Sequence, residues 1–233
     1  MSFFSKILNG KSIKESDIQE LVSPYGLGIG SKVEIDALNL KVNYPNTILQ
    51  TDYESIDTLT ITSYSVTQYS DEIFIHKFHY DSGYFEVVSD EFCSNLTGAV
   101  SWYQFLFDTV LLDDQMVDDW IGEDGMVGQP TFTLENEEEN NGIMFHRTLY
   151  SDEDRRINVE RELTVYKSAE DYEQYNVEAM EYSRILDEDL DSYENLIVEV
   201  IQQEYYEAKI HVGVELKDSD LTITRGSITI NEY

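Results

Sequence analysis

Apolar and polar side chains alternate along most of the chain after residue 32, and this period of two is the feature that most constrains the fold. Successive side chains of a β-strand point to opposite faces of a sheet, so the alternation is typical of a strand with one face against a core. The alternating segments are rich in β-branched and aromatic residues, which favour strands. The sequence predicts strands within 33–35, 38–42, 46–53, 57–69, 71–81, 84–90, 158–167, 177–186, 193–200 and 221–230.

Two pairs of alternating segments predict β-hairpins. Ser82-Gly83 separates the runs 71–81 and 84–90, and we expect the glycine to supply the positive φ of the turn. The run 131–150 contains Asn141-Gly142 at the end of an acidic tip, which is a strong hairpin signal.

Fewer segments show a helical pattern. The run 113–122 carries acids in its first turn and ends on Gly122, which predicts a helix. The apolar run 101–112 fits a buried strand or a helix, because periodicity alone does not separate the two. The polar run 167–176 predicts a connecting loop or one helical turn. A short helix is also expected from Ser16 to the residues before Pro24.

We therefore expect an α+β fold, a mostly antiparallel β-rich single domain with a few short helices. The chain has three prolines, and it shows neither a low-complexity linker nor a repeat of fixed period. We expect two parts, an N-terminal amphipathic helical segment at 1–23 and one β-rich domain at 24–233.

The acidic composition limits the classes of partner. The chain has 47 Asp and Glu against 15 Lys and Arg, a formal net charge of -32. Such a surface repels nucleic-acid phosphates, so direct binding to DNA or RNA is disfavoured. It attracts cations and basic proteins, although a solubilising surface has the same composition.

The first fourteen residues differ from the rest, because they hold three lysines and no acid. Apolar side chains recur there at helical spacing with lysines on the other faces, which predicts a short amphipathic helix. The helix either docks on an anionic membrane surface or a partner groove, or covers the core of its own domain. The residues in question are Phe3, Phe4, Lys6, Ile7, Leu8, Lys11 and Lys14.

No catalytic, cofactor or metal site emerges from the motifs. Gly26, Gly28 and Gly30 precede an alternating run rather than a helix, which favours a turn entering a strand over a phosphate loop. His76 and His79 lie three apart in a predicted strand and would face opposite sides. We expect no cofactor and no metal, and we favour a non-enzymatic role over an enzyme.

Three further patterns bear on compartment and surface. The single Cys93 and the absence of an N-terminal secretory signal predict a cytoplasmic protein, with peripheral contact at the inner membrane as an extension. The arginines are expected to pair with nearby carboxylates rather than to hold a phosphate. The 17 tyrosines suit either an interaction surface or an ordinary β core.

Five segments taken in order, "YGLGIGSKVEID", "GMVGQPTFTL", "MFHRTLY", "VEAMEYSRIL" and "YENLIVEVIQ", resemble the YjfK-like bacterial domain family of unknown function. The resemblance matches Gly28 and Gly30 to a family turn, and Arg147 and Arg184 to recurring arginines in strands. It implies no catalytic residue. It implies an envelope-stress context, because such proteins are often encoded beside a phage-shock-protein-A-like protein and a ligase resembling glutathionylspermidine synthase.

Three functional hypotheses follow. The first is an accessory interaction protein that meets a basic or membrane-associated partner through its acidic surface and its basic N-terminus. The second is an enzyme or a polyamine- or cation-binding protein whose acidic surface attracts a cationic substrate. The third is mimicry of nucleic acid by the acidic surface. The sequence leaves the oligomeric state open.

Overall fold

The computed structural model describes residues 25–49, 58–70, 72–89, 96, 98–135, 142–157, 159–166 and 172–224. Its main feature is a large antiparallel sheet. The strands of this sheet are β3 (Ser63–Gln68), β4 (Phe74–Tyr80), β5 (Gly83–Ser89), β6 (Val100–Leu111), β7 (Thr131–Leu134), β8 (Ile143–Arg147), β9 (Glu160–Tyr166), β10 (Tyr172–Asp187), β11 (Ser192–Gln202) and β12 (Tyr206–Leu216).

Eight of these strands close into a barrel. The order of pairing is β11-β12-β6-β5-β4-β3-β9-β10, and β10 pairs again with β11 along the register from Asn176↔Gln202 to Asp187↔Ser192. All of these pairings are antiparallel, and β8 with β7 extends from the outer end of β10. Our expectation of an α+β fold is therefore wrong, because strands dominate and the sheet closes on itself. Closure removes the free edges that an open sheet would need helices or loops to cover.

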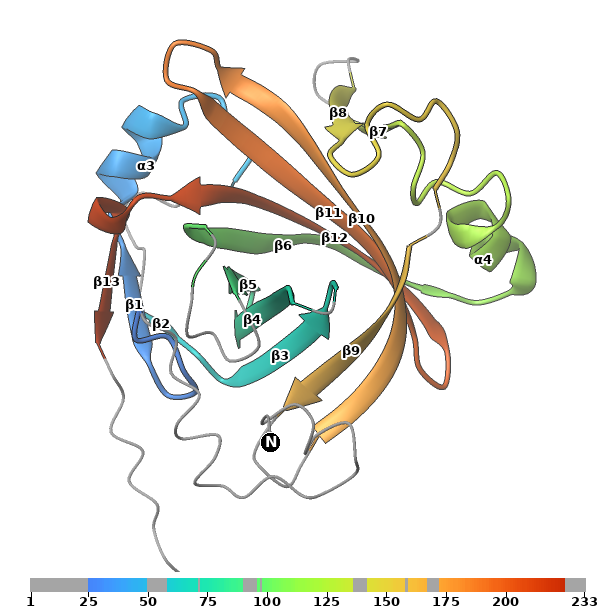
Figure 1. The fold of residues 1–233 in the computed structure, drawn as a ribbon, viewed down its shortest axis with the longest axis horizontal. Coiled ribbons are helices and arrows are strands. Elements are labelled where there is room, and N and C mark those ends of the chain that lie inside the picture. The colour runs from blue at the N-terminus through green and yellow to red at the C-terminus, as the bar shows by residue number, and fades with distance from the viewer. Residues whose placement is uncertain are drawn as a thin grey trace, which may run out of the picture.

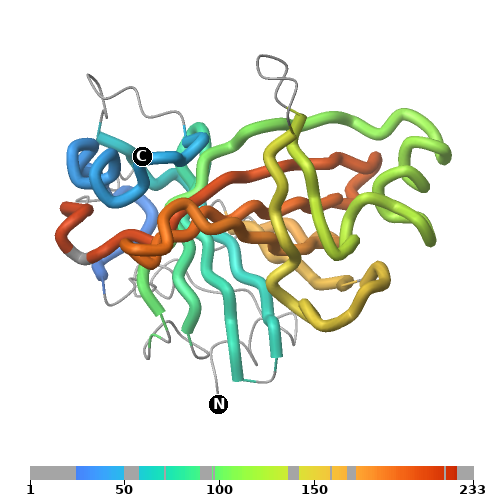
Figure 2. Tube along the Cα trace, turned by 90° about the horizontal axis from the view of Figure 1, so that it is seen from above, coloured from blue at the N-terminus to red at the C-terminus, as the bar shows by residue number. Residues whose placement is uncertain are grey.

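A second layer packs on the outside of the barrel. Figure 1 shows a small sheet and helix α3 on one side, with β7, β8 and α4 on the other. The small sheet has the order β13-β1-β2. Its strands are β1 (Lys32–Ile35), β2 (Leu59–Thr60) and β13 (Leu221–Thr224), and the 3-10 helix η1 (Asp218–Asp220) precedes β13. Figure 2 shows the same layers from above.

The main hydrophobic core lies between the barrel wall and this outer layer. One alternating set of wall residues packs there with side chains from the outer layer, and their burial supplies most of the hydrophobic stabilisation. Buried members of this core from the wall and the outer layer include Leu27, Val33, Leu40, Phe78, Phe85, Trp102, Phe145, Met180, Tyr182, Leu196, Val198 and Val212.

The two α-helices in the described part of the chain test the sequence expectations in opposite ways. Helix α4 (Asp114–Ile121) confirms the predicted helix, with Asp113 as N-cap and Gly122 as C-cap. The strand expected at 38–42 is wrong, because α3 (Ala37–Asn43) occupies it. The Asp36 side chain accepts hydrogen bonds from the Leu38 and Asn39 backbone N–H groups, and this cap begins the helix.

Both predicted hairpins are confirmed, but the role expected of Gly83 is wrong. Tyr80 pairs with Gly83, so the turn of the β4–β5 hairpin is Asp81-Ser82 and Gly83 lies within β5. The positive-φ glycines are Gly26, Gly30 and Gly128 among the described residues. Gly83 is needed for close approach, because a Cβ atom there would lie 2.0 Å from the Tyr103 carbonyl oxygen.

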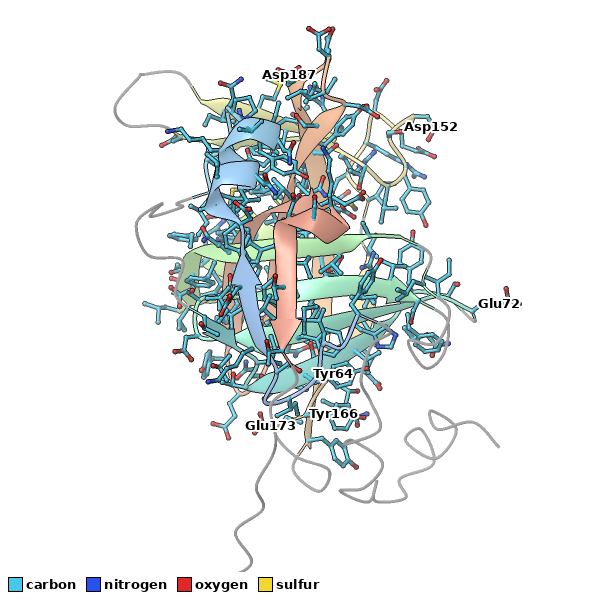
Figure 3. All side chains as sticks on the ribbon, turned by 90° about the vertical axis from the view of Figure 1, so that its left-hand side faces the viewer. Tyr64, Glu72, Asp152, Tyr166, Glu173 and Asp187 are labelled. Carbon is cyan, nitrogen blue, oxygen red and sulfur yellow. The ribbon has the colours of Figure 1, made fainter. Side chains whose placement is uncertain are left out.

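The structure also settles two segments for which the sequence left alternatives open. The ambiguous run 101–112 is largely strand β6, which pairs with β12 along its whole length. The loop or helical turn expected at 167–176 is wrong for its second half, where β10 begins at Tyr172. The fully buried side chains include Tyr84, Tyr103, Tyr166 and Tyr182, so the structure uses these tyrosines as core. Figure 3 shows Tyr64 beside Tyr166, and their rings stack at 5.9 Å.

Candidate functional site

The interior of the barrel is lined by charged side chains, and one contact establishes which face of the wall points inward. Lys77 on β4 and Glu199 on β11 form an ion pair, with 3.4 Å between Nζ and Oε2. These strands lie four steps apart in either direction around the barrel, so the two side chains meet only through its interior. The residues that alternate in phase with Lys77 and Glu199 therefore line the lumen.

Glu199 is the centre of a buried network. Its second oxygen, Oε1, accepts a hydrogen bond from His211 Nε2 on β12 at 3.1 Å. Burial alone would raise the pKa of the Glu199 carboxyl, but Lys77 and the His211 hydrogen bond outweigh it and hold the pKa well below its usual range. Burial lowers the pKa of His211 despite Glu199. The network thus contains a carboxylate, an ammonium and a neutral imidazole.

A second histidine lies on the same inner face. His79 on β4 is hydrogen-bonded through Nε2 to the Ser65 hydroxyl at 2.7 Å. Burial, assisted by the charge of Lys77, lowers the pKa of His79 to about 3, so this imidazole is neutral at physiological pH. Tyr84 lies between the histidines, with its ring centroid 5.6 Å from His79 and 5.1 Å from His211.

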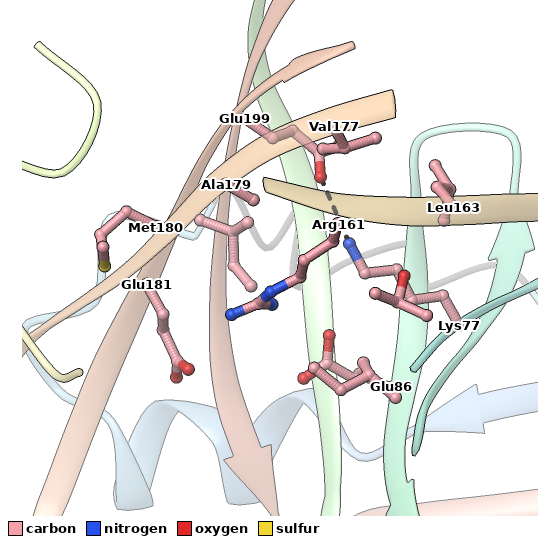
Figure 4. A pocket seen from close by; sticks show the side chains of 12 residues that line it. Lys77, Glu86, Arg161, Leu163, Val177, Ala179, Met180, Glu181 and Glu199 are labelled. Carbon is pink, nitrogen blue, oxygen red and sulfur yellow. Dashed lines mark hydrogen bonds and ion pairs between the residues drawn. The ribbon is translucent and has the colours of Figure 1, made fainter. Parts of the chain in front are cut away.

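An inner cavity of about 40 Å³ lies beside Lys77 and Glu199. Glu86 on β5, Arg161 on β9 and Glu181 on β10 also line it, and Figure 4 shows these three side chains converging from different strands. Burial raises the pKa of Glu86 to about 7. It raises the pKa of Glu181 as well, although Arg161 opposes the shift.

A larger cavity of about 540 Å³ opens at the end of the barrel that carries the β4–β5 turn and Gln203. The two cavities share Lys77, Leu163 and Glu199 in their walls, so they adjoin within the barrel interior. The larger cavity combines apolar and polar lining. Its side chains include Ser63, Ser65, His79, Tyr84, Phe105, Val165, Tyr175, Ile201, Lys209 and His211.

Several buried polar atoms of this lumen lack a hydrogen-bond partner. They are the Tyr84 hydroxyl, Glu86 Oε2 and His211 Nδ1. Buried polar groups in native proteins are almost always satisfied by protein, water or ligand. Because His211 donates from Nε2 to the Glu199 carboxylate, its neutral ring offers Nδ1 as an acceptor. The lumen thus presents unused donors and acceptors to a bound molecule.

Within the described residues, no group of three or more His, Cys, Asp or Glu side chains is arranged to hold a metal ion. None of the helices in the described part of the chain has the length and hydropathy that a membrane span requires. What the lumen can do chemically is bind a small polar molecule by hydrogen bonds and charge.

Apart from His79, which lines the lumen, the residues singled out from the sequence lie elsewhere or outside the described residues. The candidate partner-binding residues of 1–14, Cys93 and the boundary at 23 and 24 lie outside the described residues. Gly26 and Gly30 have φ of 88° and 83° in turns that lead into β1, so the predicted turn is confirmed. His76 and His79 do face opposite sides of β4. His76 lies outside the lumen, hydrogen-bonded to Tyr64 and Ser89.

The family arginines are structural. Arg147 is buried and donates to the backbone carbonyls of Gly128, Tyr150, Glu153 and Arg155. This set of acceptors departs from the expected pairing with carboxylates. Arg184 does pair with a carboxylate, Glu194, at 2.7 Å. Arg147 thus holds neighbouring loops against β8, and Arg184 on β10 also donates to the Asn46 backbone carbonyl.

A family model described as a protein of unknown function (DUF2491) matches residues 3–222. The chain belongs to this family. Comparisons with curated proteins and with solved structures found no match. The YjfK-like resemblance is consistent with the DUF2491 match, which carries no assigned activity.

Sequence reasoning missed the lumen residues of this DUF2491 chain. Lys77, Glu86 and Glu199 occupy the polar positions of alternating strands, and such positions normally face solvent. A partial signal was present, because polar positions of successive strands carry charges of both signs, as an enclosed network requires. The alternation itself does not tell an open sheet from a closed one.

Proposed function

We propose that this protein binds a small polar organic molecule in the lumen of its barrel. The observation that carries the proposal is the set of buried, unpartnered polar atoms, the Tyr84 hydroxyl, His211 Nδ1 and Glu86 Oε2, along a lumen that opens at one end. A molecule in the lumen would give these atoms the partners that buried polar groups require.

The dimensions support a binding role. An eight-stranded barrel has an interior that side chains just fill, or that holds one small ligand. Ligand cavities typically measure about 300–1,000 Å³ and combine apolar walls with a few placed polar groups. The open cavity, at about 540 Å³, lies in this range and has both kinds of lining.

The energetics of the buried charges point the same way. Replacing a buried ion pair by packed apolar side chains is often neutral or stabilising, so stability alone does not account for Lys77 and Glu199 in the lumen. Such a pair is better explained by recognition of a polar ligand. The enclosed, low-dielectric site strengthens each polar contact that the ligand makes.

A variant in which a large side chain blocks the lumen tests the proposal. Ser63 is half-buried at the wall of the open cavity, so Ser63→Trp should fill the mouth without disturbing the core. The matched control is Thr131→Trp, at an exposed position of β7. We expect members of a panel of small polar metabolites to raise the melting temperature of the wild type and of Thr131→Trp, but not of Ser63→Trp. Equal responses of all three proteins, or no response of any, would refute lumenal binding.

We also propose that residues 1–14 contact a membrane-associated or basic protein partner, in a role accessory to membrane stress. The supporting observation is the segregation of charge, with three lysines and no acid in this segment of a chain whose net charge is -32. One short basic segment binds an anionic membrane weakly, so a protein partner would strengthen a peripheral contact. Nucleic acid is a poor partner for this charge.

A further inference from the structure

The inner cavity contains more carboxylates than cations. Two cationic side chains, Lys77 and Arg161, line it together with three carboxylic side chains, Glu86, Glu181 and Glu199. An enclosed site of low dielectric does not hold an uncompensated charge at low free energy. The two cations leave one of the three carboxyl groups without a compensating charge. That group must therefore carry a proton or meet a cation from outside the chain.

The pairing pattern shows which carboxyl groups are uncompensated. Lys77 lies directly opposite Glu86 in the β4–β5 register, yet its Nζ contacts Glu199 across the barrel. Glu199 also receives the His211 hydrogen bond. Arg161 is then the remaining cation near Glu86 and Glu181, and Glu86 Oε2 is buried without a partner.

We propose that the inner cavity binds the primary ammonium group of a small organic amine, with Glu86 Oε2 and Glu181 as the accepting groups. This inference rests on the proposed lumenal binding. An ammonium group brings the missing positive charge and three N–H donors in a compact volume, which suits a cavity of about 40 Å³. Water would offer donors without the charge.

The lining that the two adjoining cavities share indicates where the rest of such a ligand would lie. Leu163 lines both cavities, and Val165 and Ile201 line the open one. An amine whose nitrogen lies between Glu86 and Glu181 would extend its carbon chain past these apolar side chains towards the mouth. The site therefore suits an aliphatic amine better than a bare inorganic cation.

The binding has a proton linkage that distinguishes it from adsorption to the acidic surface. Burial holds the pKa of Glu86 near 7, so part of the population carries a proton on this group at neutral pH. An ammonium ligand would displace that proton, and its affinity should fall about tenfold for each unit of pH below 7. The groups that face Glu86 from the packed strands are Lys77, Arg161, Glu181, Glu199 and the Tyr103 hydroxyl.

Calorimetric titration of the full chain with butylamine and 1,4-diaminobutane tests the site, with butyrate and 1-butanol as probes of the same length. We expect stoichiometric binding of the amines at moderate salt, with release of about half a proton at pH 7 and of nearly one proton at lower pH. Glu86→Gln should weaken amine binding at least tenfold, and Glu181→Gln should weaken it too. The control Glu162→Gln changes an exposed carboxylate next to Arg161 and should bind like the wild type.

The outcomes separate this inference from the proposed function. If butyrate or 1-butanol binds and Ser63→Trp abolishes that binding, the lumen is a ligand site but the ammonium assignment is wrong. If the amines bind Glu86→Gln and Glu181→Gln as they bind the wild type, they are surface counterions and the assignment is also wrong. If Glu86→Gln does not fold, proton release by the wild type still separates binding at Glu86 from adsorption to the acidic surface. Surface binding of amines near pH 7 would release no proton.

Discussion

At the residue scale, the ion pair that Lys77 forms determines the charge arrangement of the lumen. The cross-strand neighbour of Lys77 is Glu86, but its ammonium group reaches Glu199 on the opposite wall. Lys77 and the His211 hydrogen bond outweigh burial and hold the pKa of Glu199 well below its usual range. Burial raises the pKa of Glu86 to about 7, although Lys77 opposes the shift. Two glutamates in one lumen therefore differ in protonation near neutral pH.

Glu86 makes the stability of the protein depend on pH. Its folded-state pKa of about 7 lies above the ordinary value of 4.5, so the folded protein holds this proton more tightly than the unfolded chain. The contribution of Glu86 is thus favourable at low pH and is lost as the pH rises from 4.5 to 7. We expect Glu86→Gln to be more stable than the wild type above pH 7, by on the order of 3 kcal/mol, with the gain shrinking towards pH 4.5.

Urea unfolding from pH 4.5 to 8 measures this difference, with Glu162→Gln as the exposed control. Parallel stability curves for Glu86→Gln and the wild type over this range would show that Glu86 is already compensated in the folded protein. The measurement needs no ligand, so it is independent of lumenal binding.

At the scale of elements, alternation and turn residues predicted most strands, and local caps decided the exceptions. The segment 38–42 alternates as a strand would, but the Asp36 cap and its two backbone hydrogen bonds begin α3 there. The glycine of the β4–β5 hairpin was found from the sequence, while its reason was not. The close approach of β5 to the Tyr103 carbonyl of β6 is a tertiary contact, which no local pattern reports.

We expect Gly83→Ala to destabilise the protein by about 2 kcal/mol or more, because the new Cβ atom would lie 2.0 Å from the Tyr103 carbonyl oxygen and backbone must shift. The matched control is Gly98→Ala, where no heavy atom lies within 4 Å of the new Cβ. That change should be neutral or slightly stabilising, because it restricts the unfolded chain. Equal midpoints of urea unfolding for the two variants would contradict the role assigned to Gly83.

At the scale of the whole molecule, the barrel separates two electrostatic environments. The chain carries a net charge of -32, yet the lumen holds Lys77, Lys209 and Arg161 beside its carboxylates. Long-range attraction of cations to the acidic protein and selection by the lumen are therefore different steps. Salt screens the long-range attraction, whereas it screens contacts with the buried groups of the lumen much less.

Removal of residues 1–14 tests the proposed partner contact. Capture from native lysate at physiological salt should recover membrane-associated or basic proteins with the full chain and lose them with the shortened chain. The melting temperature of the shortened chain should equal that of the full chain if the segment is a docking element. The same captured proteins together with a lower melting temperature would instead assign Phe3, Phe4, Ile7 and Leu8 to the core.

Barrel closure marks the division between what the sequence determined and what the tertiary structure decided. The sequence by itself determined most of the strands, both hairpins and helix α4, because side-chain alternation, turn residues and caps act over a few neighbouring residues. It left β6 open between strand and helix and did not predict β12. It also determined the acidic charge. Only the tertiary structure decided that β10 pairs with β11 and closes the barrel, because this pairing depends on twist, stagger and contacts between distant strands. Closure turned the polar faces of the strands inward, and it thereby made Lys77, Glu86 and Glu199 parts of one site.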